Sequence, residues 1–242
     1  MKRFFCVLLF IAAVIGGLLL CDHVTRRDDS ERKFRSFYDE KQDIDVFFMG
    51  TSHVLDDITP MELWRDFGVT SYNIGTSSEC LGMTEWILKL TAEVHKPKIA
   101  VIDVYYIDKP LDSAWTYSYR HLFFDSYPLS FRKFEAVRAT LPKEQWMEFM
   151  MPFSLYHSRW EELMTGTSAR MIDCEPFMMG SEMRIGHGEP LPYTRTHEMT
   201  EGELPGMQAL RNIAAYCREN GIEPVFMALP APSSEQQQAD MN

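Results

Sequence analysis

Residues 45–53, with the sequence DVFFMGTSH, decide the fold of this chain. Four apolar residues stand between an aspartate and a glycine, which is the pattern of a short β-strand buried on both of its faces. Two hydroxyl-bearing residues, Thr51 and Ser52, follow the glycine, and His53 comes next. The stretch therefore predicts a buried strand that ends in a loop of chemically reactive side chains.

Strands and helices alternate downstream of this stretch. Residues 69–74 and 99–106 are further runs that predict buried strands. The first crossover contains residues 59–62, TPME, a capping box with proline at the first helical position, and Gly68 suits the end of that helix. The second crossover contains residues 76–79, TSSE, which predict another capping box at the start of a helix. Alternation at this spacing predicts a parallel sheet with crossover helices.

The C-terminal part of the chain continues the same pattern. Apolar residues at helical spacing predict a helix over residues 207–217, which ends at Asn220 and Gly221. Residues 223–230 predict another buried strand. The stretch between the two blocks, residues 107–203, is then a long insertion. We expect one α/β domain over residues 44–242 that contains this insertion.

The N-terminus carries a membrane-targeting signal. Residues 4–21 are almost all apolar, and Lys2 and Arg3 precede them. The run is longer than the apolar core of a cleaved signal peptide and lacks a small-x-small cleavage site, so we expect a retained transmembrane signal anchor over residues 1–21. The two cations favour a cytoplasmic N-terminus, which places the domain outside the cytoplasm after a juxtamembrane helix or linker over residues 22–43. A cleaved signal is the alternative.

Composition and cysteine spacing exclude several classes of function. The formal net charge is −11, and no cluster of cations follows the N-terminal flank, which argues against nucleic-acid binding. Cys21 ends a weak lipidation pattern, in which Leu20 is too large for the usual small residue. Cys80, Cys174 and Cys217 form no disulfide or zinc pattern, so buried free thiols are expected. We therefore expect neither a metal nor a cofactor.

The candidate site lies where the predicted strands end. Ligands of open parallel sheets bind at the carboxyl ends of the strands, and there the loops around Ser52 and Gly75 each precede a helix. A serine hydroxyl that faces backbone N–H donors is the arrangement that acyl transfer needs. We expect Ser52 to be the nucleophile, with Gly75, Asn73 and Gly50 in the oxyanion and substrate loops. The simpler interpretations are a helix cap for Ser52 and turn residues for Gly75 and Asn73.

Two further side chains are candidates for this site. Asp103 interrupts an apolar strand, and a buried carboxylate needs partners, so it either reaches the loop around Ser52 or bonds to nearby backbone. His53 adjoins Ser52, but neighbouring side chains of an extended segment diverge. We therefore expect His53 at the rim of the site rather than as the base for Ser52.

The residues GTS at 50–52, together with Gly75 after the second strand, resemble the SGNH/GDSL hydrolase superfamily. The match is most similar to a membrane-anchored bacterial branch, which includes the D-alanine transfer protein of lipoteichoic acid synthesis and polysaccharide O-acetyltransferases. The resemblance implies a three-layer, flavodoxin-like α/β fold, Ser52 as nucleophile and Gly75 as oxyanion donor. It also implies an acyl ester substrate, an envelope polysaccharide or teichoic-acid-type acceptor, and a multispanning membrane acyltransferase as partner.

Two departures from that family pattern set the limits of the prediction. The Gly-x-Asn block after the third strand is absent, because residues 104–108 read VYYID, and no Asp-x-x-His occurs in the chain. The latter supplies the family's catalytic base, so we expect a chain truncated at its C-terminus. The predicted function is an extracytoplasmic serine esterase or acyltransferase when full length. An inactive envelope binding or scaffold module is the alternative, and a nucleotide-binding domain is disfavoured because the first loop lacks Gly-x-Gly-x-x-Gly and a P-loop lysine.

The insertion is rich in methionine and aromatic residues over residues 146–156. Such residues usually build a core or a lid, and they also suit a face toward a bilayer or a membrane partner. His121, His157, His187 and His197 lie in the insertion without the spacing of a zinc helix.

Overall fold

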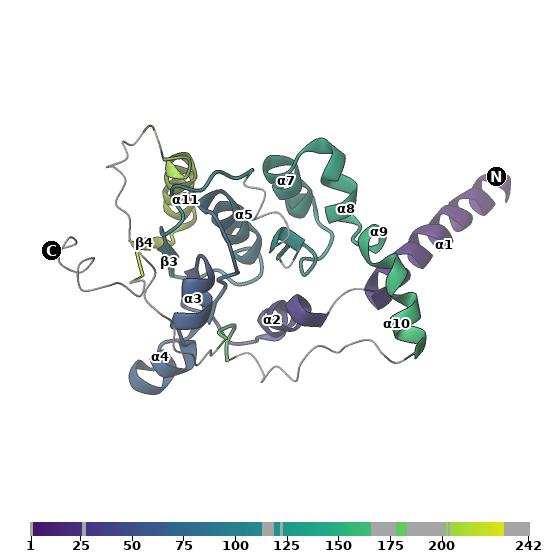
Figure 1. The fold of residues 1–242 in the computed structure, drawn as a ribbon. Helices are drawn as coiled ribbons and strands as arrows, with labels where there is room; N and C mark the ends of the chain where they lie inside the picture. Colours follow the sequence, from purple (N-terminus) through teal and green to yellow (C-terminus); the bar gives the residue numbers. More distant parts are fainter. Residues whose placement is uncertain are drawn as a thin grey trace. The chain divides into compact units, whose positions relative to one another are not determined.

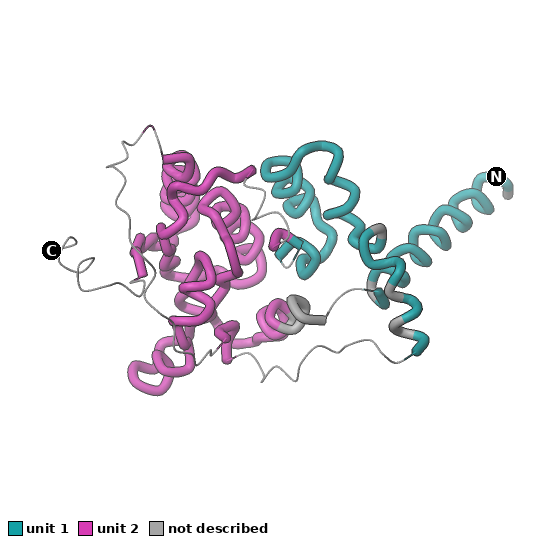
Figure 2. Tube along the Cα trace, viewed as in Figure 1, with its two compact units in different colours: residues 1–32, 121–175 teal, residues 33–120, 176–242 magenta. Residues whose placement is uncertain are grey.

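The computed structural model describes residues 2–25, 28–112, 119–121, 123–165, 178–182, 202 and 204–229. The chain forms two compact units (Figure 2). Met1–Arg32 and His121–Glu175 form the helical unit, and Lys33–Arg120 and Pro176–Asn242 form the sheet unit. This division differs from the predicted one. Part of the predicted insertion groups with the N-terminal helix, and part of the predicted linker groups with the sheet.

The sheet unit is an α/β structure built on four parallel strands (Figure 1). The strands run in the order β2–β1–β3–β4, and Phe47 of β1 lies opposite Tyr72 of β2 and Ala100 of β3. This confirms the predicted parallel sheet and places the carboxyl ends of all four strands at one edge. The strand bounds are β1 Val46–Met49, β2 Ser71–Asn73, β3 Ile99–Asp103 and β4 Glu223–Met227.

The predicted helix ends of the sheet unit agree with the structure at two glycines. Gly68 and Gly221 are both in the left-handed conformation that a helix C-cap favours, with φ of 67° in each. Pro60 stands at the first position of its helix, as predicted, but its N-cap Thr59 forms no side-chain cap hydrogen bond, so the predicted capping box is not formed. The helices of this unit are α3 Ser52–Asp57, α4 Pro60–Phe67, α5 Leu81–Thr91 and α11 Met207–Asn220.

The second predicted capping box is wrong. Helix α5 begins at Leu81 with Cys80 as its N-cap, and Ser78 has a positive φ of 60°. Glu79 accepts a hydrogen bond from the Thr76 hydroxyl at 2.8 Å, but its other oxygen accepts from the Thr84 hydroxyl at 2.6 Å. Glu79 is therefore buried as part of a side-chain network and does not cap the helix through the backbone.

The last strand is not buried, contrary to the prediction. β4 is an edge strand, paired only with β3 among the described strands, and Val225 and Phe226 are exposed. An apolar run predicts burial on both faces only when other elements cover both faces, and the sequence of one strand does not contain that information.

Helix α2, Asp28–Asp39, lies within residues 22–43, for which the sequence left a juxtamembrane helix or a linker open. Phe34 and Phe37 are buried in the sheet unit, and the ring of Phe37 meets the rings of Phe47 and Tyr72 edge-on at 5.6 and 5.1 Å. The Tyr72 hydroxyl donates to the carbonyl oxygen of Lys33 at 2.6 Å. From Lys33 onward this helix is part of the core of the sheet unit.

The helical unit combines the N-terminal helix with short helices from the predicted insertion. Helix α1, Lys2–Thr25, contains an apolar span from Arg3 to Asp22 that is long enough to cross a membrane. Buried aromatic residues, among them Phe123, Phe124 and Phe149, form the core of this unit. The remaining helices are α7 Phe131–Thr140, η1 Lys143–Gln145, α8 Trp146–Met150, α9 Phe153–Tyr156, η2 His157–Arg159 and α10 Trp160–Thr165.

Candidate functional site

The loops after β1 and β3 meet at the carboxyl edge of the sheet. Gly50 has a φ of +147°, and a Cβ atom at this position would lie 2.6 Å from the Cβ of Asp103. No side chain fits there without displacing β3, so glycine is required both by conformation and by space. The close approach brings Asp103, from the end of β3, directly beside the loop that carries Ser52.

Thr51, not Ser52, caps the helix that follows β1. The Thr51 hydroxyl accepts a hydrogen bond from the backbone N–H of His53 at 3.2 Å. Ser52 is the first residue of α3 and is half-buried. Among the described residues, no group forms a hydrogen bond with the Ser52 hydroxyl. The capping role that the sequence left open for Ser52 therefore belongs to its neighbour.

His53 packs against a tyrosine that follows β3. Its ring centroid lies 4.2 Å from that of Tyr105, with an angle of 53° between the ring planes. Nδ1 of His53 is buried, and no described residue forms a hydrogen bond with it. This places the imidazole at the same sheet edge as Asp103, with one ring nitrogen available to a proton or a ligand.

Asp103 is a buried carboxylate with one oxygen in use. It is 2 % exposed, and its Oδ1 accepts from the backbone N–H of Tyr105 at 3.1 Å. Its Oδ2 is buried with no hydrogen-bond partner among the described residues. Burial raises the pKa of Asp103 above its usual range, while the backbone N–H groups of Tyr105 and Leu229 and the nearby His53 act in the opposite direction.

Asn73 and Gly75 are held by hydrogen bonds within the sheet unit. The side-chain amide of Asn73 donates to the carbonyl oxygens of Val54 at 2.6 Å and Ile58 at 2.9 Å, which ties the end of β2 to helix α3. Its Oδ1 accepts from the backbone N–H of Gly75 at 3.0 Å. The two predicted oxyanion donors are therefore paired with protein groups here, and their part in a reaction remains a prediction.

A buried lysine, Lys33, and a buried glutamate, Glu79, lie at the Gly75 loop; no pattern in the sequence indicated the lysine, and only a capping role was predicted for the glutamate. Nζ of Lys33 donates to the carbonyl oxygen of Gly75. Burial lowers the pKa of Lys33 to about 7, against the charges of Glu182, Glu79 and Asp56, which raise it. Burial likewise raises the pKa of Glu79 to about 8. The spacing of Phe34 and Phe37 was the signal that this segment packs as a helix.

A short turn from the predicted insertion borders β2. The backbone N–H of Asn73 donates to the carbonyl oxygen of Met179 at 2.9 Å, and Met179 and Gly180 both have positive φ. A Cβ at Gly180 would lie 2.1 Å from the carbonyl oxygen of Asn73, so this position also requires glycine. The turn therefore extends the hydrogen bonding of β2 at the edge where the candidate site lies.

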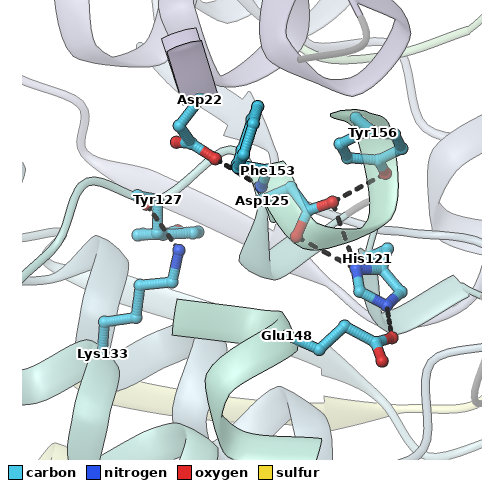
Figure 3. A network of polar contacts seen from close by, with 8 residues as sticks. All are labelled: Asp22, His121, Asp125, Tyr127, Lys133, Glu148, Phe153 and Tyr156. Carbon is cyan, nitrogen blue, oxygen red and sulfur yellow. Dashed lines mark hydrogen bonds and ion pairs between the residues drawn. The ribbon is translucent and has the colours of Figure 1, made fainter. Parts of the chain in front are cut away.

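The helical unit contains a second buried polar cluster, shown in Figure 3. His121 lies between two carboxylates, with Nδ1 3.1 Å from Asp125 and Nε2 2.8 Å from Glu148, and Tyr156 donates to Asp125 at 2.7 Å. Burial alone would lower the pKa of His121, but the hydrogen bonds and charges of Asp125 and Glu148 outweigh it, so the pKa is raised.

No metal site is found within the described residues, where no group of three or more histidine, cysteine, aspartate or glutamate side chains could hold an ion. The free thiols of Cys80 and Cys217 are buried, as expected. His187, His197 and Cys174 lie outside the described residues.

The sequence was compared with models of known protein families and with curated proteins, and neither comparison produced a match.

Proposed function

We propose that this chain is a serine esterase or acyltransferase of the extracytoplasmic face of a membrane, with Ser52 as its nucleophile. The observation that supports it best is that Asp103 lies beside the loop that carries Ser52 and His53, at the carboxyl edge of the sheet. Ser52 has a hydroxyl that is not used for capping, His53 has a buried ring nitrogen without a described partner, and Asp103 has a buried carboxylate oxygen in the same state. Nucleophilic catalysis needs such a hydroxyl with proton acceptors close by.

In the proposed reaction, Ser52 Oγ attacks the carbonyl carbon of an acyl ester. The Oγ–C bond forms, the ester C–O bond breaks, and the serine proton leaves with the alcohol. In the second step the oxygen of an acceptor hydroxyl, on an envelope polysaccharide or teichoic-acid-type polymer, or of water bonds to the acyl carbon. The Oγ–C bond breaks and the proton of the acceptor returns to Ser52 Oγ. The resemblance to the SGNH/GDSL branch supports this choice of acceptor, and it supports a multispanning membrane acyltransferase as the acyl donor.

His53 and Asp103 are the described groups that the proposal assigns to proton transfer. They are close enough for the charge of His53 to lower the pKa of Asp103, while burial raises it. A carboxyl group with a raised pKa is better matched to proton transfer near neutral pH than an exposed one. The proposal therefore assigns proton transfer to Asp103 together with His53, although the sequence predicts His53 at the rim of the site. The buried Nδ1 of His53 is the observation that favours this change.

A specific observation favours the second candidate function, an inactive envelope binding or scaffold module. The backbone N–H of Gly75 is occupied by Asn73, and the Asn73 amide is occupied by Val54 and Ile58. An oxyanion hole needs donors that point at the reacting oxygen. In this second function the loop keeps those hydrogen bonds and Ser52 is never acylated.

The test is covalent labelling of the full chain in detergent with a fluorophosphonate probe, which reacts with activated serines. We expect labelling of the wild type and its loss in Ser52→Ala, with Ser77→Ala, a half-buried serine of the neighbouring loop, as matched control. Asp103→Asn and His53→Gln should each lower the labelling rate by about tenfold or more. A folded wild type that is not labelled would sink the enzyme proposal and support the binding module.

A further inference from the structure

The last turn of helix α1 is built into the helical unit. Asp22 is 3 % exposed and Thr25 is 6 % exposed, although the apolar residues that precede them on the same helix are exposed. Oδ1 of Asp22 accepts a hydrogen bond from the backbone N–H of Phe153, the first residue of α9, at 2.8 Å (Figure 3). Helix α1 also contacts α9 and η2. The end of the apolar helix is therefore a structural part of this unit.

This contact bears on the fate of the N-terminal helix. The span from Arg3 to Asp22 has a mean hydropathy of 2.9, and its residues up to Cys21 are exposed, as expected of a helix that faces lipid. A signal peptide is removed from the mature protein, and its removal here would take away the acceptor for the first N–H group of α9. A helix whose last turn completes the fold of the following unit fits a retained anchor.

The same contact sets the level of α9 relative to the bilayer. Asp22 is the last residue of the apolar span and accepts a hydrogen bond from the first residue of α9. Helix α9 therefore begins at the level of the boundary between the hydrocarbon core and the lipid headgroups. Beyond it, α10 carries two large apolar side chains, Trp160 at 57 % exposure and Met164 at 80 %. They are four residues apart and so lie on the same side of this helix. Tryptophan at this depth is typical of the interface between membrane and water.

We propose that helix α1 is retained and that residues 153–165 lie on the bilayer that α1 spans, with Trp160 and Met164 inserted at the level of the lipid headgroups. The occupant of this exposed apolar face is lipid, because the segment that carries it begins at the contact between Phe153 and the end of the apolar helix. The segment contains one arginine and two glutamates, so its net charge is not positive and does not attract anionic lipid. Apolar contact with zwitterionic lipid is sufficient, and the exposed His157, Ser158 and Glu161 supply the polar side chains of an interfacial helix.

The test uses the full chain in nanodiscs of phosphatidylcholine with and without bromine on the acyl chains, since bromine quenches tryptophan fluorescence on contact. We expect brominated lipid to quench the wild type and Trp160→Phe to lose that quenched component. Trp64→Phe is the matched control, because Trp64 is 51 % exposed and belongs to the sheet unit. Equal quenching in the wild type and both variants would overturn the proposal, because it would show that Trp160 does not contact lipid.

Two further measurements separate loss of contact from loss of fold. Met164→Trp in the Trp160→Phe background should restore the quenched component one turn further along α10. No restoration in a variant with native circular dichroism would count against the interfacial face. The mass of the protein recovered from membranes should include residues 1–22, and a mature N-terminus after Asp22 would overturn the retained anchor. None of these readouts depends on the reactivity of Ser52.

Discussion

The two units bury ionisable groups with opposite electrostatic consequences. In the sheet unit, burial outweighs the neighbouring charges, so the pKa of Lys33 falls to about 7 and that of Glu79 rises to about 8, toward their neutral forms. In the helical unit, two carboxylates in direct contact with His121 outweigh burial and raise its pKa. Burial disfavours charge everywhere, and only partners within hydrogen-bond distance reverse that effect.

The comparison also concerns how each unit obtains its core. The sheet unit recruits Phe34 and Phe37 from α2, a segment whose charged composition reads as a linker. The helical unit recruits the end of α1, a segment whose composition reads as a membrane span. In both units a segment from the N-terminal region packs against residues that follow it in the sequence.

The largest expected effect comes from removing an aromatic ring of α2. Phe37→Ala should lower the free energy of unfolding of the sheet unit by about 3–5 kcal/mol, because a fully buried ring leaves a cavity against Phe47 and Tyr72. Hydrogen exchange read by mass spectrometry in peptides of each unit measures this. The control, Phe131→Ala, removes a ring that is 76 % exposed and should change stability by less than about 0.5 kcal/mol. Equal exchange in Phe37→Ala and wild type would show that α2 is not part of this core.

A smaller effect follows from pH. Because Glu79 ionises at about pH 4.5 when unfolded and about 8 when folded, the sheet unit should lose stability as pH rises through that window. The pKa of Lys33 is 10.5 when unfolded and about 7 when folded, so the same unit should regain stability as pH rises from 7 to 10.5. The ion pairs of His121 stabilise the helical unit below about pH 6.5, and that contribution is lost as pH rises through the raised pKa of the folded state.

Exchange at pH 5, 7.5 and 9.5, corrected for the intrinsic rate, distinguishes the two units. Between pH 5 and 7.5, Glu79→Gln should reduce the loss in the free energy of unfolding of the sheet unit by about 1 kcal/mol or more, and leave that of the helical unit unchanged. His121→Gln should reduce the corresponding loss in the helical unit and leave the sheet unit unchanged. Both units are expected to lose stability between pH 5 and 7.5, and only the sheet unit is expected to regain it above pH 7, through Lys33. A single pH profile shared by both units up to pH 9.5 would contradict this difference.

The smallest expected effect compares one helix cap from each unit. Ser130 of the helical unit accepts a hydrogen bond from the backbone N–H of Lys133 at 3.0 Å, whereas Thr59 of the sheet unit caps α4 without a side-chain hydrogen bond. Ser130→Ala should therefore cost about 1 kcal/mol and Thr59→Ala less than about 0.5 kcal/mol. Urea denaturation with exchange readout measures both, and a larger loss for Thr59→Ala would show that proline at the first position does not replace the cap.

Much of the sheet could be predicted from the sequence, because its signals are local. The four apolar residues before Gly50 predict their own strand. The glycines at the ends of α4 and α11 predict where those helices end. The burial of β4 was predicted wrongly because it depends on what covers the strand. The second capping box was predicted wrongly because the helix begins later, at Leu81, and Glu79 bonds to the hydroxyls of Thr76 and Thr84, which only the folded helix brings together.

The candidate site was predicted in part. The position of Asp103 beside the loop that carries Ser52 and His53 follows from the rule that the carboxyl ends of parallel strands lie at one edge of the sheet. The rule does not predict that Thr51 caps helix α3. It also does not predict that the side-chain amide of Asn73 donates hydrogen bonds to the carbonyl oxygens of Val54 and Ile58. Those outcomes depend on distances of a few tenths of an ångström between side chains and backbone.

The sequence by itself determined the alternation of strands and helices, the apolar N-terminal helix and the loop of Gly50, because each is written in neighbouring residues. The tertiary structure alone decided that Lys33 reaches Gly75, 42 positions away, and that Asp22 caps Phe153, 131 positions away. Contacts of that range depend on the whole packed chain, since a buried polar group takes whichever partner the surrounding elements bring within hydrogen-bond distance.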